Sequence, residues 1–91
     1  MPELVHEAQG KDSYDYFLIG KYIVAALGVC GGRPTFKGTR VEVQTVLDWL
    51  CHGLSVGQIL EAYPRLSKAA VEEAVQLASR AFREQHALRA A

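Results

Sequence analysis

Residues 43–67 read VQTVLDWLCHGLSVGQILEAYPRLS, and this stretch contains the signals that decide the fold. Apolar residues recur in its first part at steps of three and four, which predicts an amphipathic helix that ends at Gly53. Ser55 and Gln58 have the spacing of a capping box, so a second helix is expected to begin after Ser55. Pro64 stops that helix, because proline lacks an amide proton and disfavours helical backbone before it.

A third helix is predicted next, with Ser67 as its cap. Glu72 and Glu73 lie near the positive end of its dipole, and Arg80 and Arg83 lie near the negative end. The apolar residues expected to face the helical core are Val43, Val46, Leu47, Leu50, Leu54, Val56, Ile59, Leu60, Tyr63, Val71, Ala74, Val75, Ala78 and Phe82. The second and third helices have the proportions of a helix-turn-helix.

The residues before this helical part are rich in aromatic and β-branched side chains. Residues 14–19 and 22–24 are predicted to form short strands, and residues 34–37 a further one. Residues 1–13 mix charged and small side chains without periodicity, so we expect a flexible N-terminal arm. The sequence thus predicts an α+β domain, mainly α, over residues 14–91, with a short β-hairpin before three helices.

Length and composition exclude several classes of protein. The 91 residues are 49% hydrophobic, and ten basic and ten acidic side chains give a formal net charge of zero. The chain is too short for two packed domains and too apolar for disorder throughout. No apolar run reaches the roughly 20 residues of a membrane helix, and the polar, acidic start is unlike a signal peptide. We therefore expect a cytoplasmic protein with a thin core, which oligomerisation would supplement.

Cysteine and histidine residues are few and scattered. Cys30 and Cys51 lack the spacing of a zinc site, so buried or half-buried free thiols are expected rather than a metal centre or a disulfide. His52 follows Asp48 by one turn, which favours a hydrogen-bonded pair on a helix surface, because Cys51 points to another side. The sequence offers no catalytic set, and we expect neither an enzyme, nor a cofactor, nor a small-molecule substrate.

Basic residues gather between residues 16 and 41, where the sequence has no acidic side chain. Lys21, Arg33, Lys37 and Arg40 are candidates for binding an anionic partner, either a phosphate backbone or an acidic peptide. The alternative is that Arg33 and Arg40 pair with acidic residues of the helices, while the glycines only shape turns. The glycine spacing is unlike that of a nucleotide-binding phosphate loop.

A helix-turn-helix would place the start of the third helix against DNA. Lys68 can meet a phosphate there, whereas Glu72 and Glu73 would repel one. The side chains therefore argue against the standard docking. A DNA contact would instead use the segment that carries Lys21, Arg33, Lys37 and Arg40, which we call the basic loop, or a surface made by dimerisation.

Apolar residues outside the predicted core indicate self-association. Trp49 lies between the core positions of its helix, and Tyr16 and Phe17 lie in the first predicted strand. Pairing of strands across a two-fold axis would cover an unpaired strand edge. We therefore expect a homodimer with these three residues at its interface.

A longer motif adds a family resemblance. Residues 31–41 read GGRPTFKGTRV and residues 58–67 read QILEAYPRLS, with Gly-Leu-Ser at residues 53–55 between them. This combination closely resembles the DUF433 family over about residues 22–79. The resemblance implies a homeodomain-like three-helix core preceded by short strands. The motif residues expected to be structural are Gly31, Gly32, Pro34, Gly38, Thr39 and Pro64.

Some members of that family resemble VapB-type antitoxins, which pair with a PIN-like nuclease toxin. The resemblance thus implies a small non-catalytic, antitoxin-like protein that binds such a toxin, with its own operator DNA as a further candidate partner. The alternative is a stand-alone homodimeric module without a nucleic-acid role. For the basic loop we favour a protein partner, because Glu72, Glu73 and the zero net charge disfavour DNA. Residues 1–13 or 82–91 are candidates for a segment that folds on the toxin.

Overall fold

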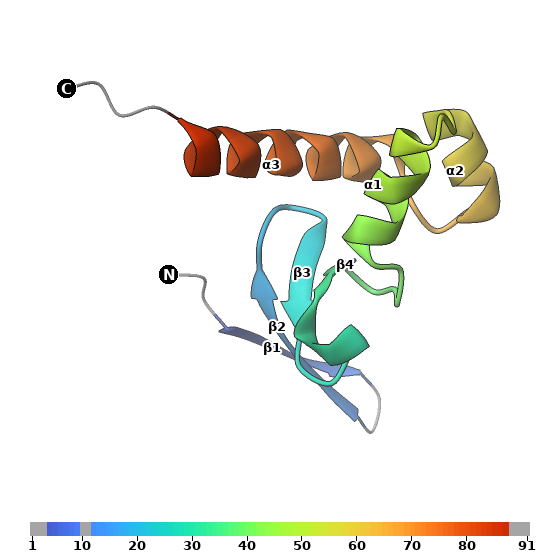
Figure 1. The fold of residues 1–91 in the computed structure, drawn as a ribbon. Coiled ribbons are helices and arrows are strands. Elements are labelled where there is room, and N and C mark those ends of the chain that lie inside the picture. The colour runs from blue at the N-terminus through green and yellow to red at the C-terminus, as the bar shows by residue number, and fades with distance from the viewer. Residues whose placement is uncertain (1–3, 10–11, 88–91) are drawn as a thin grey trace.

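A computed structural model gives the fold and describes residues 4–9 and 12–87. Over these residues, four strands and a short 3-10 turn precede three α-helices (Figure 1). The elements are β1 (Leu4–Gln9), β2 (Asp12–Leu18), β3 (Ile23–Ala26), η1 (Cys30–Gly32), β4 (Pro34–Phe36), α1 (Val43–Cys51), α2 (Val56–Ala62) and α3 (Lys68–His86). This order confirms the predicted α+β class, with strands before a three-helix part.

The strands within the described ranges form one antiparallel sheet in the order β1-β2-β3-β4. β3 lies between β2 and β4, and Ile23 of β3 stands opposite Phe36 of β4. The strands predicted at residues 14–19, 22–24 and 34–37 are present, with bounds that differ by one or two residues. The sheet is therefore a simple meander in which each strand pairs with the next along the chain.

The first strand corrects the expectation of a flexible arm for residues 4–9, while residues 1–3 and 10–11 of that predicted arm lie outside the described residues. Leu4–Gln9 is a strand that pairs with β2 along its whole length. The Tyr16 hydroxyl on β2 also donates a hydrogen bond to Glu7 Oε1 at 2.5 Å. Because cross-strand pairs stabilise a sheet, β2 supplies the order that the composition of this segment did not indicate.

The helices begin and end at the predicted signals. The amide of Gln58 donates to Ser55 Oγ at 3.1 Å and the amide of Ser55 donates to Gln58 Oε1 at 2.8 Å, which confirms the capping box. The amide of Ala70 donates to Ser67 Oγ at 3.1 Å, so Ser67 caps α3. Gly53 follows α1 with a φ of 94°, the left-handed conformation that commonly ends a helix.

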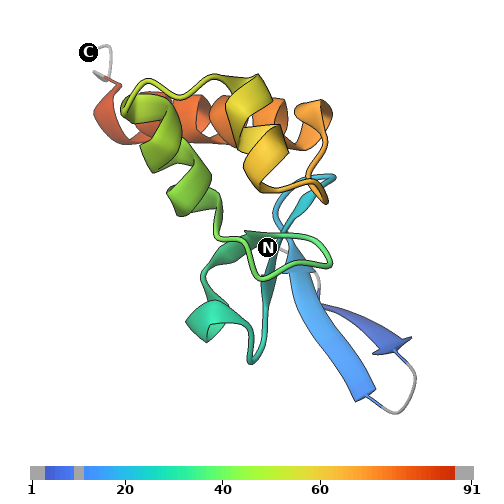
Figure 2. The same ribbon diagram turned by 90° about the vertical axis from the view of Figure 1, so that its right-hand side faces the viewer.

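The main core lies where the helices meet one end of the sheet, as the two ribbon views show (Figures 1 and 2). Its buried members are Ile23, Phe36, Val43, Val46, Ile59, Leu66, Ala70, Val71 and Ala74. Ile23 and Phe36 join the sheet to the helices, because their strands reach into this core. A smaller cluster within the sheet consists of Tyr16, Val24 and Ala26.

α3 packs on the core along its N-terminal half. Val71 and Ala74 are buried as predicted, but Val75, Ala78 and Phe82 are exposed. Figure 1 shows that the C-terminal half of α3 extends away from α1 and α2, so these helices do not cover Ala78 and Phe82, whereas Val75 lines a small surface hollow beside Val71. The prediction that the last three residues face the core is therefore wrong.

Candidate functional site

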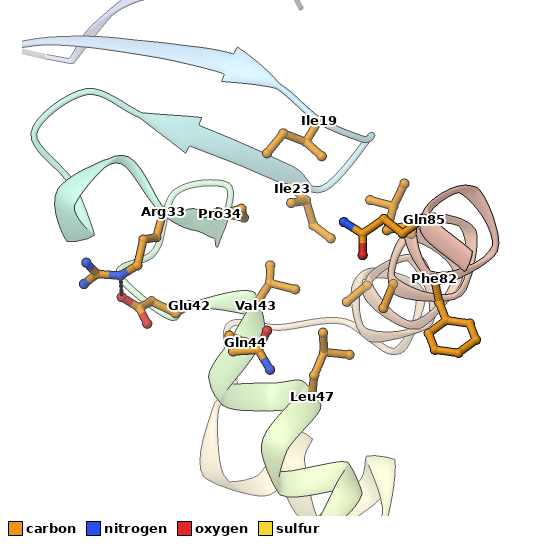
Figure 3. Close-up of a pocket in the computed structure, with 14 residues that line it drawn as sticks. Ile19, Ile23, Arg33, Pro34, Glu42, Val43, Gln44, Leu47, Phe82 and Gln85 are labelled. Atoms are coloured by element: carbon orange, nitrogen blue, oxygen red, sulfur yellow. Dashed lines mark hydrogen bonds and ion pairs between the residues drawn. The ribbon is translucent and has the colours of Figure 1, made fainter. Parts of the chain in front are cut away.

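A hollow of about 620 Å³ lies between the sheet, α1 and the C-terminal half of α3, and we call it the apolar groove. Its large apolar lining residues are Ile19 and Ile23 from the end of β2 and the start of β3, Val43 and Leu47 from α1, and Leu77 and Phe82 from α3. Figure 3 shows side chains from these three parts facing one space, with Phe82 at the outer margin. Segments far apart in the sequence thus build one apolar surface.

A charged pair stands at one end of the groove. Arg33 Nε donates to Glu42 Oε1 at 2.6 Å (Figure 3). Glu42 is the N-cap residue of α1, so the pair holds Arg33 beside the start of that helix. Glu42 is the one acidic side chain among the described residues that line the groove, and no histidine, cysteine or hydroxyl lines it. The described lining of the groove is therefore mainly apolar, with the Arg33–Glu42 pair at its end.

The rim of the apolar groove is open to solvent. Phe82 is 66% exposed and Ile19 is 41% exposed. A small-molecule site usually encloses most of its ligand, whereas exposed apolar residues beside a groove are typical of a surface that a protein covers. The shape of the groove therefore favours a polypeptide as its occupant.

The basic residues named from the sequence do not gather at one place. Arg33 belongs to the apolar groove, and Arg40 is exposed. Lys21 and Lys37 instead line a separate hollow of about 210 Å³, which Arg65 completes. We call this hollow the cationic cleft. Arg65 was not among the residues predicted from the sequence, although it lies between Pro64 and the cap of α3, in a turn at the positive end of that helix.

Lys37 has two neighbours on the β1–β2 hairpin. Its Nζ lies 3.3 Å from Glu7 Oε1 and 5.1 Å from the centroid of the Tyr16 ring. The hydrogen bond from Tyr16, followed by that from Lys37, lowers the pKa of Glu7. The contact with Tyr16, followed by that with Glu7, raises the pKa of Lys37. Both groups therefore carry their charges at neutral pH.

The acidic residues near the start of α3 lie in two different environments. Glu73 faces the turn between β2 and β3 and accepts backbone hydrogen bonds from Lys21 at 2.9 Å and Tyr22 at 2.8 Å. Glu72 lies on the exposed side, where its Oε1 is 3.9 Å from Lys68 Nζ. Of the two carboxylates expected to repel DNA, Glu73 is thus engaged within the fold.

The three candidate interface residues are largely covered within the single chain. Tyr16 is 2% exposed, which contradicts its placement on an accessible interface. Phe17 is half-buried on β2. Trp49 is also half-buried, because Tyr63 packs on it with the ring centroids 5.4 Å apart. Trp49 is therefore partly covered by Tyr63, and its place at a dimer interface stays a prediction.

The motif residues lie in turns and at the ends of elements. Gly38 has a φ of 79°, and Thr39 closes the same turn. Thr39 Oγ1 donates to the carbonyl of Phe36 at 2.7 Å and accepts from the amide of Val41 at 3.1 Å. The other motif residues are Gly31 and Gly32 in η1, Pro34 at the start of β4, and Pro64 after α2. Their positions fit the structural roles expected of them.

The remaining candidates for chemistry lie apart from one another. His52 Nδ1 is 2.7 Å from the backbone oxygen of Asp48, while the Asp48 carboxylate accepts from Gln44 Nε2 at 2.9 Å. Cys30 is half-buried, but Cys51 is exposed, which contradicts the expected burial. Over the part of the chain that the structure describes, no three His, Cys, Asp or Glu side chains gather in a way that would hold a metal ion. Nor does a helix in that part have the length and apolar character needed to cross a membrane.

Comparison with known protein families matches residues 23–78, more than half of the chain, to the family described as "Protein of unknown function (DUF433)". No curated protein and no solved structure matches the chain. The matched residues include β3, β4, α1 and α2. They exclude the end of α3 with Phe82 and the turn with Ile19, so two residues on the rim of the apolar groove lie outside the match.

Proposed function

This chain belongs to the DUF433 family, a family of unknown function, and from its own surface we propose that it is a small non-catalytic binding protein. We further propose that it acts as the antitoxin-like component of a toxin–antitoxin pair. In this role it binds a PIN-like nuclease toxin. The resemblance of some family members to VapB-type antitoxins supports this class of partner.

The apolar groove is the observation that carries the proposal. It presents apolar side chains from three parts of the fold, and its rim residues Ile19 and Phe82 are exposed. Full burial of one side chain of this size contributes about 1.5–3 kcal/mol, so a partner that covers several of them gains useful affinity. An amphipathic helix of the toxin is the natural occupant, because such a helix places an apolar stripe along a groove.

Binding to operator DNA is the second part of the antitoxin proposal. Lys68 lies on the exposed side at the start of α3, as a helix-turn-helix contact with DNA requires. Glu73 is turned toward the β2–β3 turn and accepts from two backbone amides there, so it argues less strongly against docking of this helix than Glu72 does. Glu72 still stands beside Lys68, so we rank the protein partner above DNA.

Co-purification from the native host tests the proposed function. The tagged chain is compared with Phe82→Glu in the groove and with Leu27→Glu outside it, since Leu27 is 58% exposed and does not line the groove. We expect a PIN-like nuclease with the wild type and with Leu27→Glu, and at least about tenfold less of it with Phe82→Glu, because a buried charge without a partner is costly. Co-expression of the chain should also relieve growth inhibition by that nuclease.

The alternative is a stand-alone homodimer in which a second copy covers the groove. In that case the purified wild type is a dimer by light scattering at tens of micromolar, Phe82→Glu is a monomer, and no nuclease accompanies the wild type. That combination would overturn the antitoxin proposal. A dimer that also retains the nuclease would support the antitoxin proposal, because the proposal names the nuclease as the partner and does not require the chain to be a monomer.

A further inference from the structure

We infer that the cationic cleft is a binding site for one phosphate group, held by Lys21, Lys37 and Arg65. These side chains come from three separate turns and line one hollow. The inference does not depend on the toxin partner, since Arg65 and both lysines lie outside the lining of the apolar groove.

Backbone hydrogen bonds place the two lysines beside each other. The amide of Lys37 donates to the carbonyl of Tyr22 at 2.8 Å, which ties the turn after β4 to the residue that follows Lys21. The amide of Lys21 donates to Glu73 Oε2 at 2.9 Å, so the turn between β2 and β3, which carries Lys21, is fixed to α3. The Lys21 ammonium then lies 5.3 Å from the centroid of the Tyr22 ring. The main chain that carries both lysines is thus fixed before any ligand arrives.

Arg65 reaches the cleft from the turn between α2 and α3. The next residue, Leu66, is buried in the main core, and its amide donates to the carbonyl of Tyr63 at 3.0 Å. Within the described residues, the side chains of Arg65 and Lys21 form no ion pair with a carboxylate. Their charges are therefore available to a ligand.

The cleft concentrates positive charge in a chain whose formal net charge is zero. Glu7 offsets part of this charge through its contact with Lys37, and the carboxylate of Glu73 lies against the backbone amide of Lys21, so the three cations exceed the two carboxylates by one positive charge. Like charges that line one hollow repel each other, and this cost falls when an anion enters. An anionic ligand is therefore the partner that the electrostatics of the cleft favour.

Phosphate fits the donors of the cleft better than a carboxylate does. Two ammonium groups and a planar guanidinium offer donors in several directions, and a phosphate accepts through three or more oxygens, whereas a carboxylate has two. Ser67 also lines the cleft, and because its Oγ accepts from the amide of Ala70, its hydroxyl proton can still be donated to a phosphate oxygen. The volume of about 210 Å³ suits one such group rather than a polypeptide segment. The phosphate can come from a nucleic-acid backbone or from a free phosphate or nucleotide.

Titration of the isotope-labelled full chain with inorganic phosphate tests the site. Ionic strength is held constant with chloride, and backbone amide resonances are followed. We expect saturable shifts at residues 21–22, 37–39 and 65–67. Lys21→Gln and Arg65→Gln should each weaken binding by about tenfold, as expected for loss of a charge-assisted hydrogen bond. Arg80→Gln removes the same charge from an exposed part of α3 and should leave binding unchanged.

The controls separate a site from a general attraction of charge. Glu7→Gln should tighten phosphate binding, because it frees Lys37 from its carboxylate partner. Shifts that never saturate, or that Arg80→Gln reduces as much as Arg65→Gln does, would overturn the inference. Equal binding of acetate or of a glutamate-rich peptide would overturn the choice of phosphate. Should either glutamine variant unfold, Lys21→Arg and Arg65→Lys keep the charge and must retain saturable shifts.

Binding of a DNA duplex and binding of a mononucleotide are measured to identify the source of the phosphate. If the backbone of nucleic acid supplies it, the double variant Lys21→Gln/Arg65→Gln weakens duplex binding and lowers the salt slope by about two counterions. If a free phosphate supplies it, the mononucleotide binds as inorganic phosphate does, and duplex retention stays at background. Both results support the phosphate site, and failure of all three probes to bind would overturn it.

Discussion

The carboxylate of Glu73 on α3 accepts a hydrogen bond of 2.8 Å from the backbone amide of Tyr22, which fixes the turn before β3 against the helix. Its other oxygen accepts from the amide of Lys21 at 2.9 Å. This turn carries Ile19 of the apolar groove and Lys21 of the cationic cleft. One side chain of α3 therefore positions residues of both candidate sites.

Removal of this carboxylate should destabilise the fold. We expect Glu73→Ala to lower the free energy of unfolding by about 1–3 kcal/mol, because two backbone amides lose a charged acceptor. Urea denaturation measures the change. Glu72→Ala is the matched control, since Glu72 is exposed and makes only a loose pair with Lys68, and it should stay within about 0.5 kcal/mol of the wild type. Equal losses in the two variants would contradict the role of Glu73.

Gly20 is the glycine that the same contact requires. A Cβ at this position would lie 2.5 Å from Glu73 Oε1 and 2.7 Å from its Cδ, so Gly20→Ala must displace the carboxylate. The free energy of unfolding should fall by about 1–3 kcal/mol, as for loss of the hydrogen bonds themselves. In a double-mutant cycle, Gly20→Ala should cost much less in the Glu73→Ala background, because the clash has already been removed. Additive losses in that cycle would show that Gly20 acts through something other than Glu73.

Gly38 tests a different cause, the conformation of the backbone. Its φ is 79°, and among the described residues other than its two chain neighbours no atom lies within 4 Å of an added Cβ, so space alone would allow a side chain. Gly38→Val should nevertheless cost about 1–3 kcal/mol, because a β-branched residue strongly disfavours positive φ. Gly38→Asn should be clearly milder in the same thermal or urea measurement, since asparagine tolerates the left-handed region. A melting temperature that Gly38→Val leaves unchanged would contradict the prediction.

The helices could be predicted from the sequence because their signals are local. Ser55 and Gln58 form their capping box within one turn, and Ser67 caps α3 in the same way. β1 could not be predicted, because Leu4–Gln9 depends on its pairing with β2. The exposure of Phe82 could not be predicted from the sequence either, because it depends on how far α3 extends beyond α1 and α2.

The candidate sites depend still more on tertiary contacts. Sequence proximity grouped Arg33 with Lys37, but Arg33 pairs with Glu42 at the apolar groove. Arg65 joins the lysines only because the buried Leu66 places its turn next to them. Charge along the sequence therefore indicated the kind of site, while packing of the turns decided which residues form it.

The pair of Glu7 and Lys37 predicts how stability depends on pH. The pKa of Glu7 lies below its ordinary value of 4.5, so the folded state favours the charged carboxylate. The contribution of this carboxylate to the free energy of unfolding is therefore complete above pH 4.5 and is lost as the pH falls through the lowered pKa. The pKa of Lys37 lies above 10.5, so its contribution is complete below 10.5 and lost as pH rises through the raised pKa. The difference in free energy of unfolding between wild type and Glu7→Gln should thus be widest between these two values.

Urea denaturation of the wild type and of Glu7→Gln across the pH range measures this difference. The cause can be separated by titrating Glu7 by NMR. Tyr16→Phe should return the pKa of Glu7 toward 4.5 more than Lys37→Gln does, since the hydrogen bond from the Tyr16 hydroxyl is the larger cause of the shift. A Glu7 that titrates at 4.5 in the wild type would show that the hairpin contact does not hold its charge.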